Sequence, residues 1–217
     1  MFKINYKGSD YNKVEKIVTL ASAYVLNYFG IKNYNIIINI LDSREEFDRA
    51  LGEKTADWIV GNSDGNVINI FSPTAMGKQG GHKSTEFNSV LTHEMTHSIL
   101  ERLVSGKFIP VWLNEGISAY IAKQHQSSER IYYVEENFCQ KLGTHKGWDE
   151  NVKYGSYKLA ALFVSYLIKK YSFEKIKQLL TSLDKVYYYK NFQQLFFKVY
   201  GKTIDELESE FVKFINK

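Results

Sequence analysis

The chain has 217 residues, of which 44% are hydrophobic and 24% are charged, and its formal net charge is +4. These values fit a single globular domain with a sizeable core, and so mild and dispersed a charge gives no indication of a nucleic-acid partner. The single cysteine, Cys139, excludes an internal disulfide, and we expect it to be a packing residue.

Segments that would direct the chain to a membrane are not visible in the sequence. No run of residues approaches the ~18 consecutive apolar residues of a membrane span. Residues 1–7 lack the hydrophobic region of a signal peptide. We therefore expect no membrane span and a soluble, cytoplasmic protein, although a secretion signal trimmed from the chain would leave the same sequence.

The first hundred residues begin with a helix and a strand. Residues 11–29 carry apolar side chains at helical spacing, and Gly30 ends the pattern. Residues 35–41 are rich in isoleucine and apolar almost throughout, which predicts a central strand. A short helix follows, capped by Asp42 or Ser43.

A hairpin is expected next. Residues 58–61 and 67–71 have strand composition, and residues 62–66 contain the turn-forming run Asn-Ser-Asp-Gly-Asn. Residues 73–83, with three glycines, then read as a loop. The sequence therefore predicts a small mixed sheet with helices in about residues 1–83.

A long helix carries the most informative motif. No glycine or proline occurs from residue 85 to 105, and Ser84 is a suitable N-cap. Within this helix the chain reads His93-Glu94-Met-Thr-His97. Residues four apart lie on one helix face, so both imidazoles can bind one metal ion while Glu94 handles the proton of a water molecule.

A second segment supplies the ligand that a catalytic zinc ion still lacks. Two histidines leave such an ion one protein ligand short, because catalytic sites use three and keep the fourth position for water. Glu115 lies in the segment Val-Trp-Leu-Asn-Glu-Gly-Ile, which predicts a new helix after the turn through Gly106 and Pro110. A carboxylate near the start of that helix would complete a His-His-Glu set.

The rest of the chain is predicted to be mainly helical, from about residue 84 to 217. Helices are expected from Ser127 or Ser128 to Leu142, and over residues 154–171, 173–183 and 204–215. Residues 144–148 are expected to break the first of these as a loop that borders the active site.

At the two motif segments the chain resembles the gluzincin metallopeptidases, in the peptidase-MA-like branch that includes the zinc aminopeptidases. The resemblance runs through His93-Glu94-x-x-His97 and Trp-Leu-Asn-Glu115-Gly and covers about residues 66–180. It implies a single zincin-like α+β domain, zinc bound by both histidines and Glu115, and Glu94 as general base. A tyrosine that helps to hold the oxyanion is also implied, and Tyr157 matches it best, with Tyr154 close enough to compete.

One departure from the family bears on specificity. The Gly-x-Met-x-Asn segment with which the aminopeptidases capture a free amino terminus is absent. We therefore expect a zinc-dependent peptidase that is not a strict aminopeptidase. Its substrate would be a peptide or protein, and the strand at residues 67–71, carrying Asn69, could pair with it if that strand edges the sheet. Tyr154 and His145 are further candidates for substrate contact.

Two readings without peptidase activity stay open at this point. The chain could be a catalytically silent metal-binding or protein-interaction domain on the same fold, although Glu94 is present. It could also be a helical protein in which the motif is accidental, and such a protein would bind no stoichiometric metal.

Overall fold

A computed structural model describes residues 2–79, 81–124 and 137–215. The chain divides into two compact units, Met1–Ile99 and Leu100–Lys217, and the division falls inside one helix. The sequence had suggested a change from mixed to helical structure nearer residue 84. The two units are described separately.

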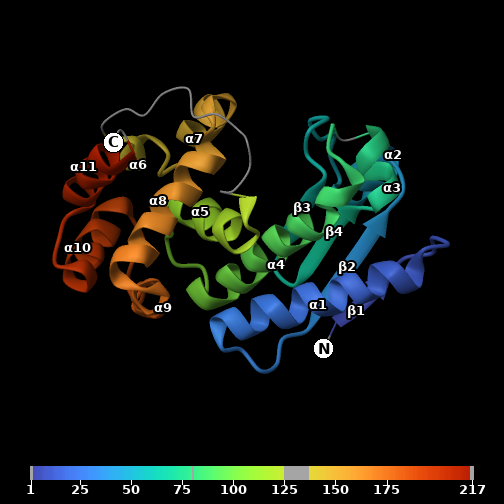
Figure 1. The fold of residues 1–217 in the computed structure, drawn as a ribbon, viewed down its shortest axis with the longest axis horizontal. Helices are drawn as coiled ribbons and strands as arrows, with labels where there is room; N and C mark the ends of the chain where they lie inside the picture. Colours follow the sequence, from blue (N-terminus) through green and yellow to red (C-terminus); the bar gives the residue numbers. More distant parts are fainter. Residues whose placement is uncertain (1, 80, 125–136, 216–217) are drawn as a thin grey trace. The chain divides into compact units, whose positions relative to one another are not determined.

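The first unit contains the sheet (Figure 1). Its elements in chain order are β1 (Phe2–Asn5), α1 (Tyr11–Phe29), β2 (Ile36–Leu41), α2 (Arg44–Leu51), β3 (Gly61–Asp64), β4 (Val67–Phe71), α3 (Pro73–Gln79), the short 3-10 helix η1 (Ser84–Glu86) and the first part of α4 (Phe87–Val104). The helix predicted over residues 11–29 is confirmed, whereas α3 lies where a loop was expected.

The four strands have the order β1-β2-β4-β3. Strands β1, β2 and β4 are parallel, and β3 pairs antiparallel with β4. The prediction of a central strand is confirmed by β2. Residues 67–71 could pair with a substrate only if they edged the sheet, and this condition is not met, because β4 lies between β2 and β3.

The hairpin is present, but its first strand is shifted along the chain and its turn is tighter than the sequence suggested. Strand β3 begins only at Gly61, the last residue of the expected strand, and continues to Asp64, through residues that were expected to turn. Asp64 pairs with Val67, which leaves a two-residue turn at Gly65 and Asn66. Backbone φ at Gly65 is +56°, a value that glycine adopts without steric cost.

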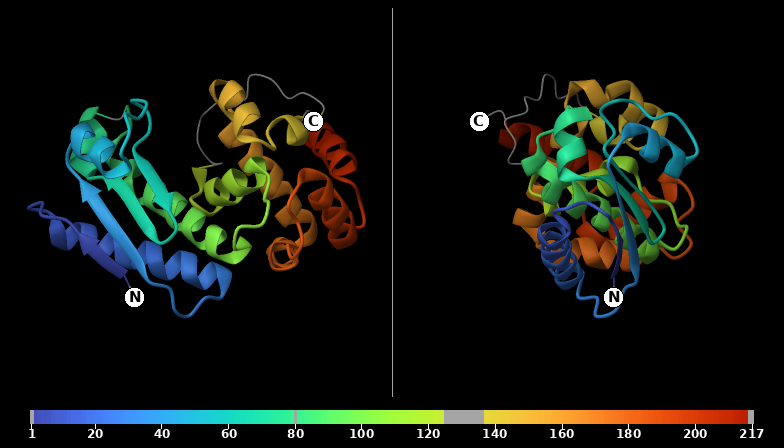
Figure 2. Two further views of the ribbon diagram at one scale, coloured as in Figure 1. Left: turned by 180° about the vertical axis from the view of Figure 1, so that it is seen from behind. Right: turned by 90° about the vertical axis from the view of Figure 1, so that its right-hand side faces the viewer.

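One face of the sheet is buried under helices. Ile38, Ile68 and Ile70 point to this face and are fully buried. Helix α1 lies along the sheet (Figures 1 and 2). Ser22 of α1 contacts the sulfur of Met95 on α4 at 3.7 Å, so these two helices meet in the same core.

The opposite face carries a row of asparagines, one from each strand. Asn5, Asn39, Asn69 and Asn62 are register partners across the sheet. Nδ2 of Asn5 donates to Oδ1 of Asn39 at 2.7 Å, and Nδ2 of Asn39 donates to Oδ1 of Asn69 at 2.9 Å. The row joins neighbouring strands through their side chains as well as their backbones.

The described residues of the second unit form helices and their connections, without a strand. After the end of α4, its elements are α5 (Val111–Ile121), α6 (Phe138–Lys141), α7 (His145–Asn151), the 3-10 helix η3 (Val152–Tyr154), α8 (Ser156–Tyr171), α9 (Phe173–Thr181), α10 (Tyr189–Tyr200) and α11 (Ile204–Ile215). Its core contains an aromatic cluster in which Phe163 contacts Trp112, Phe138 and Phe211 at centroid distances of 5.2–5.4 Å.

Three helices of this unit depart from the sequence-based expectation. The start predicted at Ser127 or Ser128 lies outside the described residues, and α6 is a single turn. The loop expected at residues 144–148 is instead the start of α7, because the Thr144 hydroxyl accepts from the Gly147 backbone N–H at 3.2 Å and caps a helix. Helix α10 was not anticipated. Residues 204–215 are helical as predicted.

The helices α5 and α8 pack unusually closely. A Cβ atom at Gly116 would lie 2.7 Å from the carbonyl oxygen of Ala160 and 2.8 Å from a methyl group of Val164. Only glycine therefore allows the two backbones to approach this far. Because Gly116 directly follows Glu115, this close packing also fixes the backbone at Glu115 relative to α8.

We also examined whether a helix of the described residues could span a membrane. None of their helices is both long and apolar enough to cross a bilayer.

Candidate metal centre

Helix α4 is buried along most of its length, and two of its buried hydroxyl groups are bonded within it. The hydroxyl of Thr92 donates to the carbonyl of Asn88 at 2.7 Å, and that of Thr96 donates to the carbonyl of Thr92 at 2.8 Å. Such back-bonding removes the cost of burying a hydroxyl without a partner.

The polar residue that follows the motif ties α4 to the hairpin. The hydroxyl of Ser98 contacts the carbonyl of Gly65 in the β3–β4 turn, and the hydroxyl of Tyr34 lies 2.9 Å from the Ser98 carbonyl. The motif helix and the hairpin are therefore joined one residue after His97.

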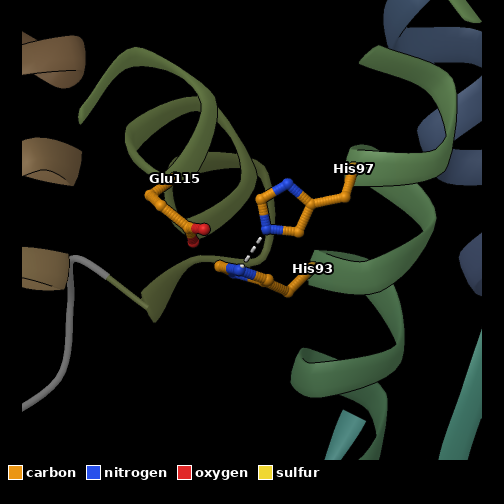
Figure 3. A group of neighbouring side chains, drawn as sticks. All are labelled: His93, His97 and Glu115. Atoms are coloured by element: carbon orange, nitrogen blue, oxygen red, sulfur yellow. Dashed lines mark hydrogen bonds between the residues drawn. The ribbon is translucent and has the colours of Figure 1, made fainter. Parts of the chain in front are cut away.

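Three potential metal ligands come together from α4 and α5. One ligand atom from each of His93, His97 and Glu115 lies within 4.8 Å of the others. Figure 3 shows the two imidazoles and the carboxylate directed toward one another. The Nε2 atoms of His93 and His97 are 2.8 Å apart, and the two rings meet edge to face.

These donors suit zinc in type and spacing. Imidazole nitrogen and carboxylate oxygen are both common zinc ligands, at about 2.0–2.2 Å from the ion. Two donors on a tetrahedral ion are then about 3.4 Å apart, a value between the 2.8 Å of the histidine pair and the 4.8 Å limit of the whole group. Zinc would therefore fit with small rotations of the side chains.

Glu94 lies against the backbone of the edge strand. A Cβ atom at Gly61 would be 2.9 Å from Cγ of Glu94 and 3.0 Å from its Oε1. The absence of a side chain at Gly61 is thus what makes room for the Glu94 carboxylate. Because Glu94 is largely buried, this contact limits the positions that its carboxylate can take.

The edge of the sheet is open beside this glutamate. Among the described residues the sheet ends at β3. The backbone N–H of Phe71 donates to the carbonyl of Val60 at 3.0 Å. Hydrogen-bonded and non-hydrogen-bonded pairs alternate along an antiparallel ladder, so Gly61 and Ser63 direct their N–H and C=O groups away from β4.

The two candidate tyrosines lie in different surroundings. Tyr157 is in the first turn of α8, where its ring packs edge to face against Trp148 at a centroid distance of 4.9 Å. Tyr154 belongs to η3 and is exposed, with the Lys153 ammonium 5.1 Å from its ring centre. A catalytic role for Tyr157 remains a prediction.

The other predicted substrate residues are not brought to the histidine pair by any described contact. Asn69 is buried and bonded to Asn39, on the sheet face opposite Gly61. His145 is exposed at the start of α7. Their contact with a substrate remains a prediction. Cys139 is fully buried, and burial raises the pKa of its thiol, which agrees with a packing residue.

Gly61 is the residue near the motif that the sequence did not single out. Its role depends on the register that sets it opposite Ile70 and over α4. A usable signal was the two-residue turn at Gly65 and Asn66, since extending the strand back from such a turn places residues 61–64 in β3.

The comparisons with known proteins give one match. A family model described as the Peptidase MA superfamily matches residues 63–217, which is more than half of the chain and includes both motif segments. Comparisons with curated proteins and with solved structures find no significant match. The α+β fold, with its small mixed sheet followed by many helices, agrees with that family. The chain therefore belongs to the peptidase MA superfamily.

Proposed function

We propose that the protein is a zinc-dependent peptidase that hydrolyses peptide bonds and is not a strict aminopeptidase. The observation that carries this proposal is the group of His93, His97 and Glu115, with Glu94 next to the first ligand and beside the open edge of the sheet.

In this proposal the two histidines and Glu115 hold the ion. Bound zinc supplies a Lewis acid that polarises a carbonyl group and lowers the pKa of a coordinated water. Glu94 accepts the proton of the attacking water and passes it to the departing amine, as a general base and then a general acid. The Glu94 carboxylate is suited to this task because Gly61 and its own burial restrict its position.

The substrate backbone would pair with β3. The outward N–H and C=O groups of Gly61 and Ser63 can bond to an extended peptide in the manner of an added strand. Because Gly61 contacts Glu94, a peptide bonded at Gly61 would run next to the general base. Strand β3 thus takes the substrate-pairing role first considered for β4, because β4 is already paired with a strand on each side.

Tyr157 is the proposed donor to the oxyanion that forms when water attacks the carbonyl. Tyr157 lies in the first turn of α8, and its ring packs edge to face against Trp148. Misplacement of a catalytic group by about an ångström can cost a hundredfold in rate, so a packed tyrosine is better suited to this task than the exposed Tyr154.

The metal assignment is tested by removing one ligand. We expect purified wild-type protein to bind about one zinc ion per chain and His97→Ala to lose it, since two remaining ligands are fewer than a catalytic site uses. Metal analysis measures this directly. His82→Ala is the matched control, because His82 pairs with Glu86 at 2.8 Å and has no place in the group. Full zinc content in His97→Ala would refute the assignment.

The general base is tested by Glu94→Gln, which keeps the shape of the side chain and removes its basicity. We expect normal zinc content and a loss of at least about a hundredfold in kcat on a peptide pool. Glu45→Gln, at an exposed carboxylate on α2, should behave as wild type. Unchanged turnover in Glu94→Gln would mean that another group accepts the proton.

Whether the protein needs a free amino terminus on its substrate is tested with paired peptides that differ only in N-terminal acetylation. We expect the zinc-loaded protein to cleave both members of each pair, because the amine-capturing segment of the aminopeptidases is absent. Mass spectrometry identifies the bonds cleaved. Cleavage restricted to the peptides with a free amino terminus would contradict this part of the proposal.

The choice between the two tyrosines is tested by removing each hydroxyl in turn. Tyr157→Phe should lower kcat by roughly ten- to a thousandfold with unchanged zinc content, the range expected for loss of one oxyanion donor. Tyr154→Phe should have a smaller effect and is the natural control. A larger loss in Tyr154→Phe than in Tyr157→Phe would reverse the assignment.

A further inference from the structure

Trp58 differs from the other two tryptophans of the chain in its exposure. Its exposed fraction is 53%, whereas Trp112 is at 0% and Trp148 at 5%. Single exposed apolar side chains are ordinary on protein surfaces. Exposure alone therefore assigns no role to Trp58, and any role must be inferred from the residues around it.

The backbone on both sides of Trp58 is held by one guanidinium group. Nη2 of Arg44 donates to the carbonyl of Asp57 at 2.8 Å, and its Nη1 donates to the carbonyl of Ile59 at 2.7 Å. The same guanidinium lies 4.6 Å from the ring centre of Phe71 on β4. The segment that carries Trp58 is therefore tied to the sheet.

A second set of bonds fixes the start of this segment. The backbone N–H and the hydroxyl of Thr55 both donate to Oδ1 of Asp48, at 3.1 and 2.7 Å. These bonds, with the hydroxyl bond the stronger cause, lower the pKa of Asp48. Nη1 of Arg44 also donates to the Thr55 hydroxyl at 2.7 Å. An indole on so constrained a backbone would lose little conformational entropy on binding.

The position of Trp58 follows from the start of the edge strand. Trp58 precedes Gly61 by three residues, which span at most about 10 Å of chain. A peptide paired with β3 alternates its side chains between the two faces of the sheet. Arg44 holds the Trp58 segment beside Phe71, on the face opposite the buried isoleucines. Side chains of the peptide that project to that face are thus on the face to which Arg44 ties the Trp58 segment.

We propose that Trp58 binds an apolar or aromatic side chain of the substrate, two or three residues from the bond that is cleaved. This inference rests on the proposed peptidase function and adds a determinant of substrate preference to it. Trp58 is a specificity residue here and takes no part in proton transfer.

Binding is tested by fluorescence, since Trp58 is the only strongly exposed tryptophan. The zinc-loaded Glu94→Gln protein is titrated with blocked peptides that differ at one position, leucine or phenylalanine against serine. We expect the apolar peptides to shift tryptophan emission to shorter wavelength and to reduce quenching by acrylamide. The serine peptides should do so only at higher concentration, and Trp58→Phe should lose the signal while keeping the fold.

Kinetics of the wild type and of Trp58→Ala measure the same preference during turnover. We expect kcat/KM for the apolar peptides to fall roughly tenfold, mostly through KM, which corresponds to the upper range for one aromatic contact. The serine peptides should be little affected, and Trp58→Phe should recover part of the loss. Phe197→Ala is the matched control, because Phe197 is also 53% exposed but belongs to α10.

The outcomes separate this inference from the proposed function. Efficient peptide cleavage with no response of Trp58 fluorescence and equal kinetics in Trp58→Ala overturns the inference and leaves the peptidase assignment intact. A fluorescence response that depends on apolar peptides, in a zinc-loaded wild-type protein that cleaves none of them, supports Trp58 as a peptide-binding residue and refutes the peptidase function.

Discussion

Helix α4 places His93, Glu94 and His97 among side chains that are nearly all buried. Polar groups on a buried helix restrict which residues can lie around them. Buried polar groups need partners, and the helix provides them locally for Thr92 and Thr96. The side chains of His93, Glu94 and His97 can then be held in fixed positions without a penalty from Thr92 and Thr96 of the same helix.

The same constraint explains the two glycines closest to the motif residues. Gly61 leaves room for the carboxylate of Glu94, and Gly116 lets α5 approach α8 directly beside Glu115. In both places a side chain of any size would meet backbone or a buried group. Each glycine therefore matters because it has no side chain and leaves space for its neighbour. Both positions therefore affect how a candidate site residue is placed without contributing a functional group of their own.

What could be predicted from the sequence depended on the range of the underlying interaction. The pairing of His93 with His97 follows from helical spacing alone, and the central position of β2 follows from its isoleucine-rich composition. Both features could therefore be predicted from the sequence. Helix α7 depends on a cap at Thr144 within a glycine-containing segment that reads as a loop. That β3 rather than β4 forms the edge of the sheet, and that Gly61 therefore lies at this edge, depends on strand order, which no local pattern determines.

The composition of β3 has a consequence for how a peptide could be recognised. Its four residues, Gly-Asn-Ser-Asp, are small or polar, which is how natural edge strands avoid pairing with other chains by hydrophobic contact. Such a strand can still bond to the backbone of a peptide, but it offers no apolar surface to distinguish one side chain from another. Selectivity would have to come from groups flanking the strand, and Trp58, held by Arg44 three residues before β3 begins, is a large exposed apolar group in that position.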